Sequence, residues 1–327
     1  MENFNNTEKM PGSNAKMSGN NAKASSSRFK KFTDWFKTNE VWLDLIIYPI
    51  MLFVLVIMLY PFLNVVAIAF NDSMDTVRGG VHIWPRAFTL ENIKQMIAHP
   101  NLDRAAINSL IRTGLGTAVN VLFISLTAYV LSRKDFILRK QLTLLFTISM
   151  YVSGGLIPDY LLRIKLGMMN SFSVYIIPGL ISVFLVVLMR TYMDTIPESL
   201  QESARIDGAT DIYIYARIIM PLCLPSIATV VLFSSVGHWN AWFDAYLYNS
   251  RSPGLTLLQY ELQKVLQDTV RANEEMLGMD IMRAMERVTP RSMRMAITLL
   301  VTLPIVFVYP FIQRYLIKGM MVGSIKG

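Results

Sequence analysis

The sequence predicts an all-α membrane protein in which six transmembrane helices form a polytopic bundle. Of its 327 residues, 53% are hydrophobic and 17% are charged, a balance too apolar for an ordinary soluble domain. Six apolar stretches also approach the roughly 20 residues that a helix needs to cross a hydrocarbon core about 30 Å thick. The predicted spans are Leu45–Phe70, Ile107–Leu131, Leu142–Leu162, Phe172–Met193, Leu222–Trp242 and Met293–Ile312.

A polar segment precedes the first span. Residues 1–27 are rich in Asn, Ser, Lys and Gly and lack apolar periodicity, which predicts a disordered tail. Within residues 28–44, the aromatic side chains of Phe32, Trp35 and Phe36 recur at helical spacing, which predicts an amphipathic helix at the membrane surface. The first apolar run begins only near residue 45, too late for a secretory signal, so we expect an uncleaved anchor.

The distribution of Lys and Arg predicts the orientation of the spans. Seven basic residues occur up to Lys37, four in the loop Ser132–Gln141 and three near the C-terminal end, and such residues favour the cytoplasmic side. An even number of spans places both termini together, so we expect both in the cytoplasm. The excess of 31 basic over 23 acidic residues then indicates cytoplasmic loops rather than nucleic-acid binding. The outer segment before the last span departs from this tendency, with Arg283, Arg287, Arg291 and Arg294.

Helix-breaking residues interrupt four of the predicted spans, and such breaks require neighbouring helices or a water-filled cavity to bond the freed backbone groups. The second span instead carries Gly114 and Ala118, small residues that predict a close helix contact. The expected breaks are Gly154-Gly155 and Pro158-Asp159 in the third span, Pro178-Gly179 in the fourth, Gly237-His238-Trp239-Asn240 in the fifth, and Pro304 and Pro310 in the sixth.

A polar elbow, residues 195–221, connects the fourth and fifth spans. Thr195 and Glu198 have the spacing of a capping box, and Pro197 suits the first turn of a helix that should run to about Ile206. Gly208 adopts the left-handed conformation at little cost, so it predicts the end of this helix. The elbow is therefore expected to be a rigid helical unit.

A second helix of the elbow should begin near Asp211. Its apolar positions, Ile212, Tyr215, Ala216 and Ile219, recur at helical spacing. They lead into Pro221 and the fifth span.

The elbow carries a motif that resembles a known family. Glu202-Ser-Ala-x-x-Asp207-Gly208-Ala209, followed by Ile218-x-Met220-Pro221, is similar to the EAA loop of ATP-binding cassette importer permeases. Ser203 stands where Ala is usual and Met220 where Leu is usual. The C-terminal run Gln313–Gly327 resembles the carbohydrate branch, in particular its maltose-type inner-membrane subunit. The resemblance covers roughly Leu45–Gly327 and implies a type I importer permease fold over residues 45–327.

The resemblance implies how the chain would work. In that family the EAA helix sits in a cleft of a cytoplasmic ATPase, which here assigns ATPase coupling to Glu202, Ser203, Ala204, Asp207, Gly208 and Ala209. Glu202 would pair with a basic residue of the ATPase, whereas Asp207 would either contact the ATPase or cap the turn or the following helix. The C-terminal tail, residues 313–327, would reach into the ATPase dimer, with simple fraying as the alternative.

The implied assembly contains several partners in the cytoplasmic membrane of a prokaryote. They are a second homologous permease subunit, an ATPase dimer that holds ATP and Mg²⁺, an extracytoplasmic solute-binding protein and the lipid bilayer. The cargo would be a sugar, most simply an oligosaccharide, moved by alternating access. A sugar pathway needs hydrogen-bonding groups and aromatic faces. Candidate contacts are Asn120, Ser149, Ser153, Ser234, Trp239 and Asn240, all of which also suit helix contacts or the membrane interface.

The sequence predicts no enzyme active site. His82, His99 and His238 are scattered, and the single cysteine, Cys223, indicates a packed core residue rather than a disulfide or a metal site. The chain contains no Gly-x-x-x-x-Gly-Lys-Ser/Thr phosphate-binding loop, so ATP hydrolysis is expected on a partner chain. Asp159 should pair with Arg163, four residues later.

Three other functions remain open from the sequence. An ion-coupled secondary transporter would need mid-membrane carboxylates and internal repeats, and neither is evident. An importer permease for a non-sugar solute would differ only in its cargo. A membrane scaffold without transport activity is a further alternative.

Overall fold

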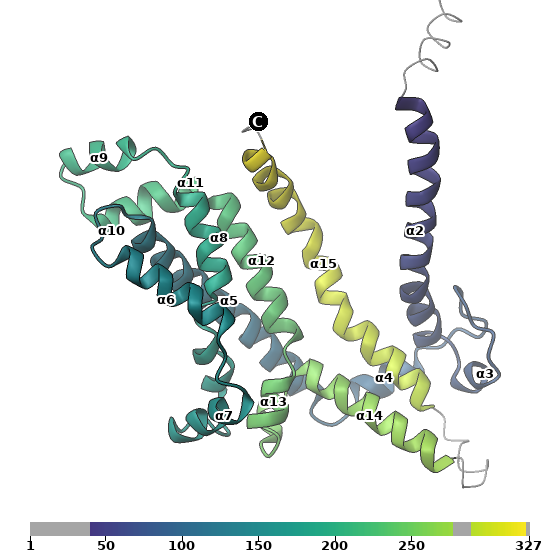
Figure 1. The fold of residues 1–327 in the computed structure, drawn as a ribbon. Helices are drawn as coiled ribbons and strands as arrows, with labels where there is room; N and C mark the ends of the chain where they lie inside the picture. The colour runs from purple at the N-terminus through teal and green to yellow at the C-terminus, as the bar shows by residue number, and fades with distance from the viewer. Residues whose placement is uncertain (1–39, 277–288, 325–327) are drawn as a thin grey trace, which may run out of the picture. The chain divides into compact units, whose positions relative to one another are not determined.

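The computed structural model describes residues 40–276 and 289–324, and the regular elements of these residues are helices (Figure 1). The predicted tail 1–27, most of the predicted amphipathic helix, Arg283, Arg287 and residues 325–327 lie outside the described residues. The longer helices are α2 Glu40–Ala69, α5 Leu102–Ser132, α6 Arg139–Tyr151, α7 Leu156–Lys165, α8 Val183–Met193, α9 Ser199–Ile206, α12 Leu224–Asn240, α14 Leu258–Met276 and α15 Pro290–Ser324. The shorter ones are α3 Ser73–Val77, α4 Glu91–Ile97, α10 Asp211–Tyr213, α11 Met220–Leu222, α13 Phe243–Tyr248, the 3₁₀ turns η1 Phe172–Tyr175, η2 Ile177–Gly179 and η4 Pro253–Leu255, and the π-helix η3 Ile214–Ile219.

The chain divides into two compact units, residues 1–62 and 63–327. In the first unit, the side chains from Leu43 to Phe62 are all exposed. A helix that is apolar on every side and exposed in this way belongs in a hydrocarbon environment.

The helices are long and apolar enough to span a membrane at the six predicted places. Among the described residues, Leu43–Ala69, Leu102–Ser132 and Pro290–Pro310 are single candidate spans. The other three are bent pairs: Arg139–Tyr151 with Leu156–Lys165 at 117°, Phe172–Gly179 with Val183–Met193 at 45°, and Asp211–Leu222 with Leu224–Asn240 at 83°. The all-α, polytopic fold class is confirmed, although the third and fifth stretches are helix pairs rather than straight rods.

Two spans break where a break was predicted, except that the second predicted break of the third span, Pro158-Asp159, lies inside α7. The third stretch breaks at residues 152–155, where Gly155 has φ of 85°, a value that side-chain-bearing residues rarely adopt. The fourth breaks around Pro178, inside a 3₁₀ turn that precedes α8.

The predicted breaks are wrong in the other two spans. Helix α12 continues through Gly237 and ends at Asn240, and the fifth stretch bends instead at Cys223, between Pro221 and Pro225. Helix α15 continues past Pro304 and Pro310. The indole N–H of Trp239 donates to the Val301 carbonyl at 3.1 Å, which links α12 to α15 three residues before Pro304.

The core of the second unit lies where α5, α8 and α12 lie side by side (Figure 1). Ile124, Met189, Ile214 and Val230 are fully buried there, together with Cys223, which confirms its predicted packing role. Around α14, the buried Leu258 and Val265 share a second cluster with α15.

The close helix contact on α5 is not at the predicted residues. Gly114 and Ala118 are exposed. Gly116, between them, lies against His238 of α12, because a Cβ atom built on Gly116 would be 2.6 Å from His238 Nε2. The spacing of small residues identified the right helix but the wrong face.

Candidate functional site

The end of α9 is fixed by backbone hydrogen bonds that the glycine makes possible. Gly208 has φ of 82°, and its N–H donates to the Arg205 carbonyl at 3.0 Å, while the Ala209 N–H donates to the Ala204 carbonyl at 2.9 Å. This pair of bonds is the Schellman arrangement, which satisfies the last carbonyls of a helix and reverses the chain in one residue. The predicted end of the helix near Gly208 is confirmed.

The start of α9 differs from the prediction. The helix begins at Ser199 after Glu198, and the Thr195 hydroxyl donates to the Tyr192 carbonyl at 2.7 Å instead of capping α9. The predicted capping box is therefore wrong, because Thr195 still belongs to the chain that closes α8. Pro197 precedes the helix and supplies a carbonyl to the Leu200 N–H at 3.3 Å.

The second helix of the elbow begins at Asp211, as predicted, and Thr210 caps it by accepting from the Tyr213 N–H. Capping of this helix by Asp207 is thus excluded. The next turn is the π-helix η3, whose wider period buries Ile214, Tyr215 and Ile219. Ile212, predicted on the buried face, is 80% exposed, because the prediction used the α-helical period.

The elbow has a buried side and an exposed side. Ala204 and Ala209 pack against the core cluster of α5, α8 and α12. Glu202, Ser203, Asp207 and Gly208 are exposed. Two residues that the motif did not include, Ile206 at 87% and Ile212 at 80%, are also exposed, and together they place apolar surface beside the acidic groups. An exposed apolar patch with a charged rim is typical of a protein contact surface.

Charged side chains join the elbow to the α5–α6 loop, residues 133–138. The Arg133 guanidinium donates to both oxygens of Asp135 at 3.1 and 2.9 Å and to Gln201 Oε1 at 2.7 Å. Arg205 contacts Asp135 at 3.2 Å and Asp211 at 3.1 Å. The hydrogen bond from Arg133 lowers the pKa of the Asp135 carboxyl, so these charges are present at neutral pH. A polar cleft of about 490 Å³ lies between α9 and this loop.

A second candidate site is a cavity that opens to the outside of this chain, because Phe184, Phe233 and Gly237 on its walls are exposed. A cavity of about 340 Å³ is lined by residues of α5, α12 and the start of α8. Four buried polar atoms on its walls have no hydrogen-bond partner among the described residues: Arg112 Nε, Asn120 Oδ1, Ser234 Oγ and His238 Nε2. Buried polar groups are normally bonded, so these walls suit water or a polar ligand. Of the six predicted contacts, Asn120 and Ser234 lie here.

Two aromatic rings complete the cavity. Phe184 of α8 and Phe233 of α12 meet edge to face with centroids 6.3 Å apart, and both rings line the cavity. Aromatic faces beside groups that both donate and accept hydrogen bonds can bind the C–H surface and the hydroxyls of a sugar ring.

Sequence reasoning missed Arg112 and His238. A charged residue inside an apolar run is itself a functional signal, and Arg112 stands inside the second predicted span. Its guanidinium lies 2.6 Å from Asp244 of α13 and over the Tyr175 ring. Arg163 of α7 contacts the same Asp244 at 3.5 Å.

The predicted pair of Asp159 and Arg163 is confirmed at 2.7 Å. Tyr248 of α13 donates a hydrogen bond to Asp159 at 3.1 Å, and the Arg163 guanidinium also stacks over the Tyr248 ring. With Arg112 and Asp244, these residues form a charged network that joins α5, α7 and α13.

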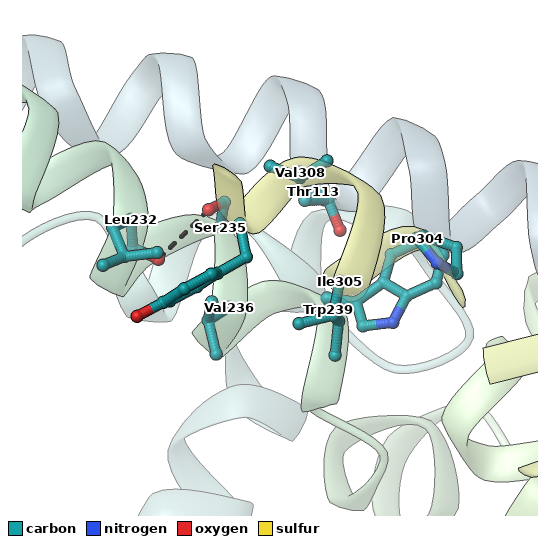
Figure 2. A pocket seen from close by; sticks show the side chains of 9 residues that line it. Thr113, Leu232, Ser235, Val236, Trp239, Pro304, Ile305 and Val308 are labelled. Atoms are coloured by element: carbon teal, nitrogen blue, oxygen red, sulfur yellow. Dashed lines mark hydrogen bonds between the residues drawn. The ribbon is translucent and has the colours of Figure 1, made fainter. Parts of the chain in front are cut away.

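The other four predicted substrate contacts do not line this cavity. Ser149 donates to the Phe146 carbonyl of its own helix at 2.7 Å, and Ser153 accepts from the Gly155 N–H at the break. Asn240 accepts from Gln259 at 3.0 Å. Trp239 lines a different, apolar cleft of about 80 Å³ beside Pro304, which Figure 2 shows between α5, α12 and α15. That cleft offers little to a sugar, because the indole N–H is already used on Val301.

Comparison with known families gives one match over most of the chain. The model of the family described as binding-protein-dependent transport system inner membrane component matches residues 38–322.

Known relatives match nearly from end to end. The chain is 34% identical over 285 residues to the polygalacturonan/rhamnogalacturonan transport system permease protein YtcP of Bacillus subtilis (strain 168), covering 87% of this chain and 98% of that protein. It is 36% identical over 273 residues to protein LplC of the same organism, covering 83% and 90%. It is 28% identical to the arabinooligosaccharides transport system permease protein AraQ of Halalkalibacterium halodurans, covering 84% and 94%.

A solved structure shares the fold. It is the crystal structure of a bacterial ABC transporter involved in the import of the acidic polysaccharide alginate. One of its chains matches with a TM-score of 0.76 and 24% identity, covering 85% of this chain and 98% of that one.

Proposed function

Because the chain belongs to the family of inner membrane components of binding-protein-dependent transport systems, we propose that it is one of two permease subunits of an ATP-binding cassette importer for an oligosaccharide. The observation that carries this proposal is the rigid elbow. Helix α9 is closed by the left-handed Gly208, packs through Ala204 and Ala209, and leaves Glu202 and Ile206 exposed. A short rigid helix of this kind transmits the movement of a partner protein, whereas a flexible loop would dissipate that movement.

The partner that drives the elbow is a cytoplasmic ATPase dimer, which binds ATP and Mg²⁺. This chain has no phosphate-binding loop of its own. Glu202 contacts a basic residue of the ATPase, and Ile206 and Ile212 add apolar contact around it. The second permease subunit and an extracytoplasmic solute-binding protein complete the importer. Both termini, the α5–α6 loop and the elbow lie in the cytoplasm.

The cargo is inferred from the relatives and from the cavity. Several relatives are permeases named for oligosaccharides or polysaccharides. The cavity that contains Asn120 and Ser234 presents groups that both donate and accept, with Phe184 and Phe233 beside them. A sugar ring suits this combination of hydrogen-bonding groups and aromatic faces.

A reconstitution experiment tests the proposal. Glu202→Lys reverses the charge of the exposed motif, and Gly208→Val forces a β-branched residue to φ of 82°, where only glycine is relaxed. We expect both variants to insert normally and to lose about tenfold or more of ATP-dependent sugar uptake, because each weakens a contact worth about 1.4 kcal/mol or more. Lys140→Glu, an exposed charge reversal on α6, serves as the control. Wild-type uptake by both variants would refute the proposal.

The two alternatives are separated by energy source and cargo. An ion-coupled transporter would continue uptake after ATP depletion and stop when the ion gradient collapses. A permease for another solute would keep its dependence on ATP but show no uptake of oligosaccharides delivered by the binding protein.

A further inference from the structure

We infer that α5 carries the movement of the elbow into the polar cavity, and that Arg133, at the end of α5, is the positioning residue that joins the two. This inference rests on the proposed function, because it describes how the driving movement reaches the substrate pathway. Three layers of contact along α5 support it.

The first layer is ionic. Arg133 is the residue after the last turn of α5, and it reaches α9 through Gln201 at 2.7 Å and approaches Asp211 of α10 at 3.9 Å. Its own loop partner, Asp135, also contacts Arg205 of α9. Only 12% of the Arg133 side chain is exposed, so these charge-assisted bonds are partly shielded from water and hold a defined geometry.

The second layer is buried and uncharged. The Tyr215 hydroxyl of η3 hydrogen-bonds to Ser125 Oγ of α5 at 2.6 Å, and the Tyr215 ring lies 5.4 Å from the Tyr129 ring. Arg133 donates to the Tyr129 hydroxyl at 3.3 Å and so connects the two layers. Residues 125, 129 and 133 are four apart, which places them on one face of the helix.

The third layer is the cavity itself. Helix α5 is continuous from Leu102 to Ser132, and Asn120 lies 13 residues, or about 20 Å, from Arg133 along the same rod. Gly116, one turn beyond Asn120, lies against His238 of α12, so a shift of α5 displaces a wall of the cavity. A single helix therefore connects the ionic layer to the polar groups that line the cavity.

Arg133 is singled out because it holds α9 on the side of the α5–α6 loop, away from the packing of Ala204 and Ala209 against the core. A cleft of about 490 Å³ separates α9 from the α5–α6 loop, so the Arg133 and Arg205 contacts cross a space that is otherwise open. Lys134 and Glu198 also pair across it, at 2.5 Å, but their side chains are 71% and 50% exposed. An exposed pair of this kind adds little rigidity.

The test compares Arg133→Gln with Lys134→Gln in the complete importer. The wild-type and variant chains are reconstituted in proteoliposomes with the partner permease, the ATPase and the loaded binding protein, and the sugar imported per ATP hydrolysed is measured. We expect Arg133→Gln to lower this ratio about fivefold with unchanged co-isolation of the ATPase. Lys134→Gln should remain within about twofold of wild type. A wild-type ratio for Arg133→Gln, or an equal loss in both variants, would overturn the inference.

A tether tests mechanical connection independently of charge. Arg133→Cys combined with Gln201→Cys removes the direct contact between Arg133 and α9 and leaves the Asp135–Arg205 pair, and a short bis-maleimide then joins α5 to α9 covalently. The native Cys223 is fully buried and does not compete. We expect the unlinked double variant to be uncoupled and the linked one to recover at least half of the wild-type ratio. A linked protein that stays uncoupled contradicts the inference.

The second layer provides a variant that does not touch a charge. Tyr215→Phe removes the hydroxyl that bonds Ser125, whereas Thr127→Ala removes a hydroxyl that bonds only the Phe123 carbonyl of its own helix at 2.7 Å. We expect a lower ratio for the first variant alone. Equal ratios would count against the transmission of movement through α5, which is called the relay below.

If the wild-type chain neither co-isolates an ATPase nor imports sugar, the proposed function fails. If it does both and the variants stay coupled, only the relay fails.

Discussion

Gly116 shows how a single missing methyl group sets the distance between two helices. The imidazole of His238 occupies the space that a Cβ would take, at 2.6 Å from the ideal Cβ position, so α5 and α12 approach closely only because residue 116 is glycine. Contacts under 3.0 Å require backbone movement when the neighbour is a packed ring.

Substitution of Gly116 should therefore destabilise the bundle. We expect Gly116→Ala to lower the free energy of unfolding by about 1–3 kcal/mol through overpacking, measured by thermal unfolding in detergent. Gly114→Ala is the matched control, because nothing lies within 4 Å of its Cβ position and a helical Ala is favoured. The double variant Gly116→Ala with His238→Ala should unfold no earlier than His238→Ala alone. Equal melting of the two glycine variants would contradict this account.

At the scale of residues, the sequence predicted which polar residues lie inside the spans, but it did not predict which groups they contact. Asn120 and Ser234 were predicted as polar groups inside spans, and both line the cavity. Trp239 and Asn240 were predicted on the same grounds, yet each is satisfied by a partner 62 or 19 residues away along the chain. Which polar atoms stay unpaired depends on tertiary packing that periodicity does not contain.

At the scale of elements, one carboxylate joins α5, α7 and α13 through charge pairs. Asp244 of α13 accepts from Arg112 of α5 at 2.6 Å and contacts Arg163 of α7 at 3.5 Å. Only 5% of the Arg112 side chain is exposed. Three helical elements thus depend on one carboxylate.

Removal of this carboxylate should loosen all three elements. Asp244→Asn leaves the buried Arg112 cation without its counter-charge, which costs about 3 kcal/mol of stability. Asp159→Asn is the comparison, because Arg163 then keeps Asp244 and the expected loss is about 1 kcal/mol or less. Thermal unfolding in detergent measures both. A larger loss of stability for Asp159→Asn than for Asp244→Asn would show that the network depends on Asp159 rather than on Asp244.

The ends of helices could be predicted from the sequence where a single residue, such as a glycine with positive φ, determines them. Gly155 and Gly208 both have positive φ, and both were predicted to end helices. Pro304 was predicted to break α15, but the helix continues past it and packs against α12. The π-helix η3 has no simple sequence signal, so the buried face of the elbow was assigned with the wrong period.

At the scale of the whole molecule, the account depends on which side of the membrane each loop faces. Six spans place the α5–α6 loop and the elbow on one side and the segments around α3 and η4 on the other. The hydrogen bond from Arg133 to Gln201 and the ion pair between Arg205 and Asp135 agree with this arrangement, since two loops on opposite faces of a bilayer could not meet. Six apolar stretches in the sequence predicted six spans, which agrees with three single helices and three bent pairs among the described residues, whereas the pairing of the two loops required the structure.

Cysteine accessibility in intact cells tests this arrangement directly. The native Cys223 is fully buried, so single cysteines can be introduced against a low background. We expect a membrane-impermeant maleimide to label Val77→Cys and Arg251→Cys in intact cells, because both positions are exposed and the proposed topology places them on the outer side. Lys134→Cys and Ile206→Cys, equally exposed, should react only after the membrane is permeabilised. Labelling of Ile206→Cys from outside would place the elbow where no cytoplasmic ATPase can reach it, and the proposed function and the relay through α5 would both fail.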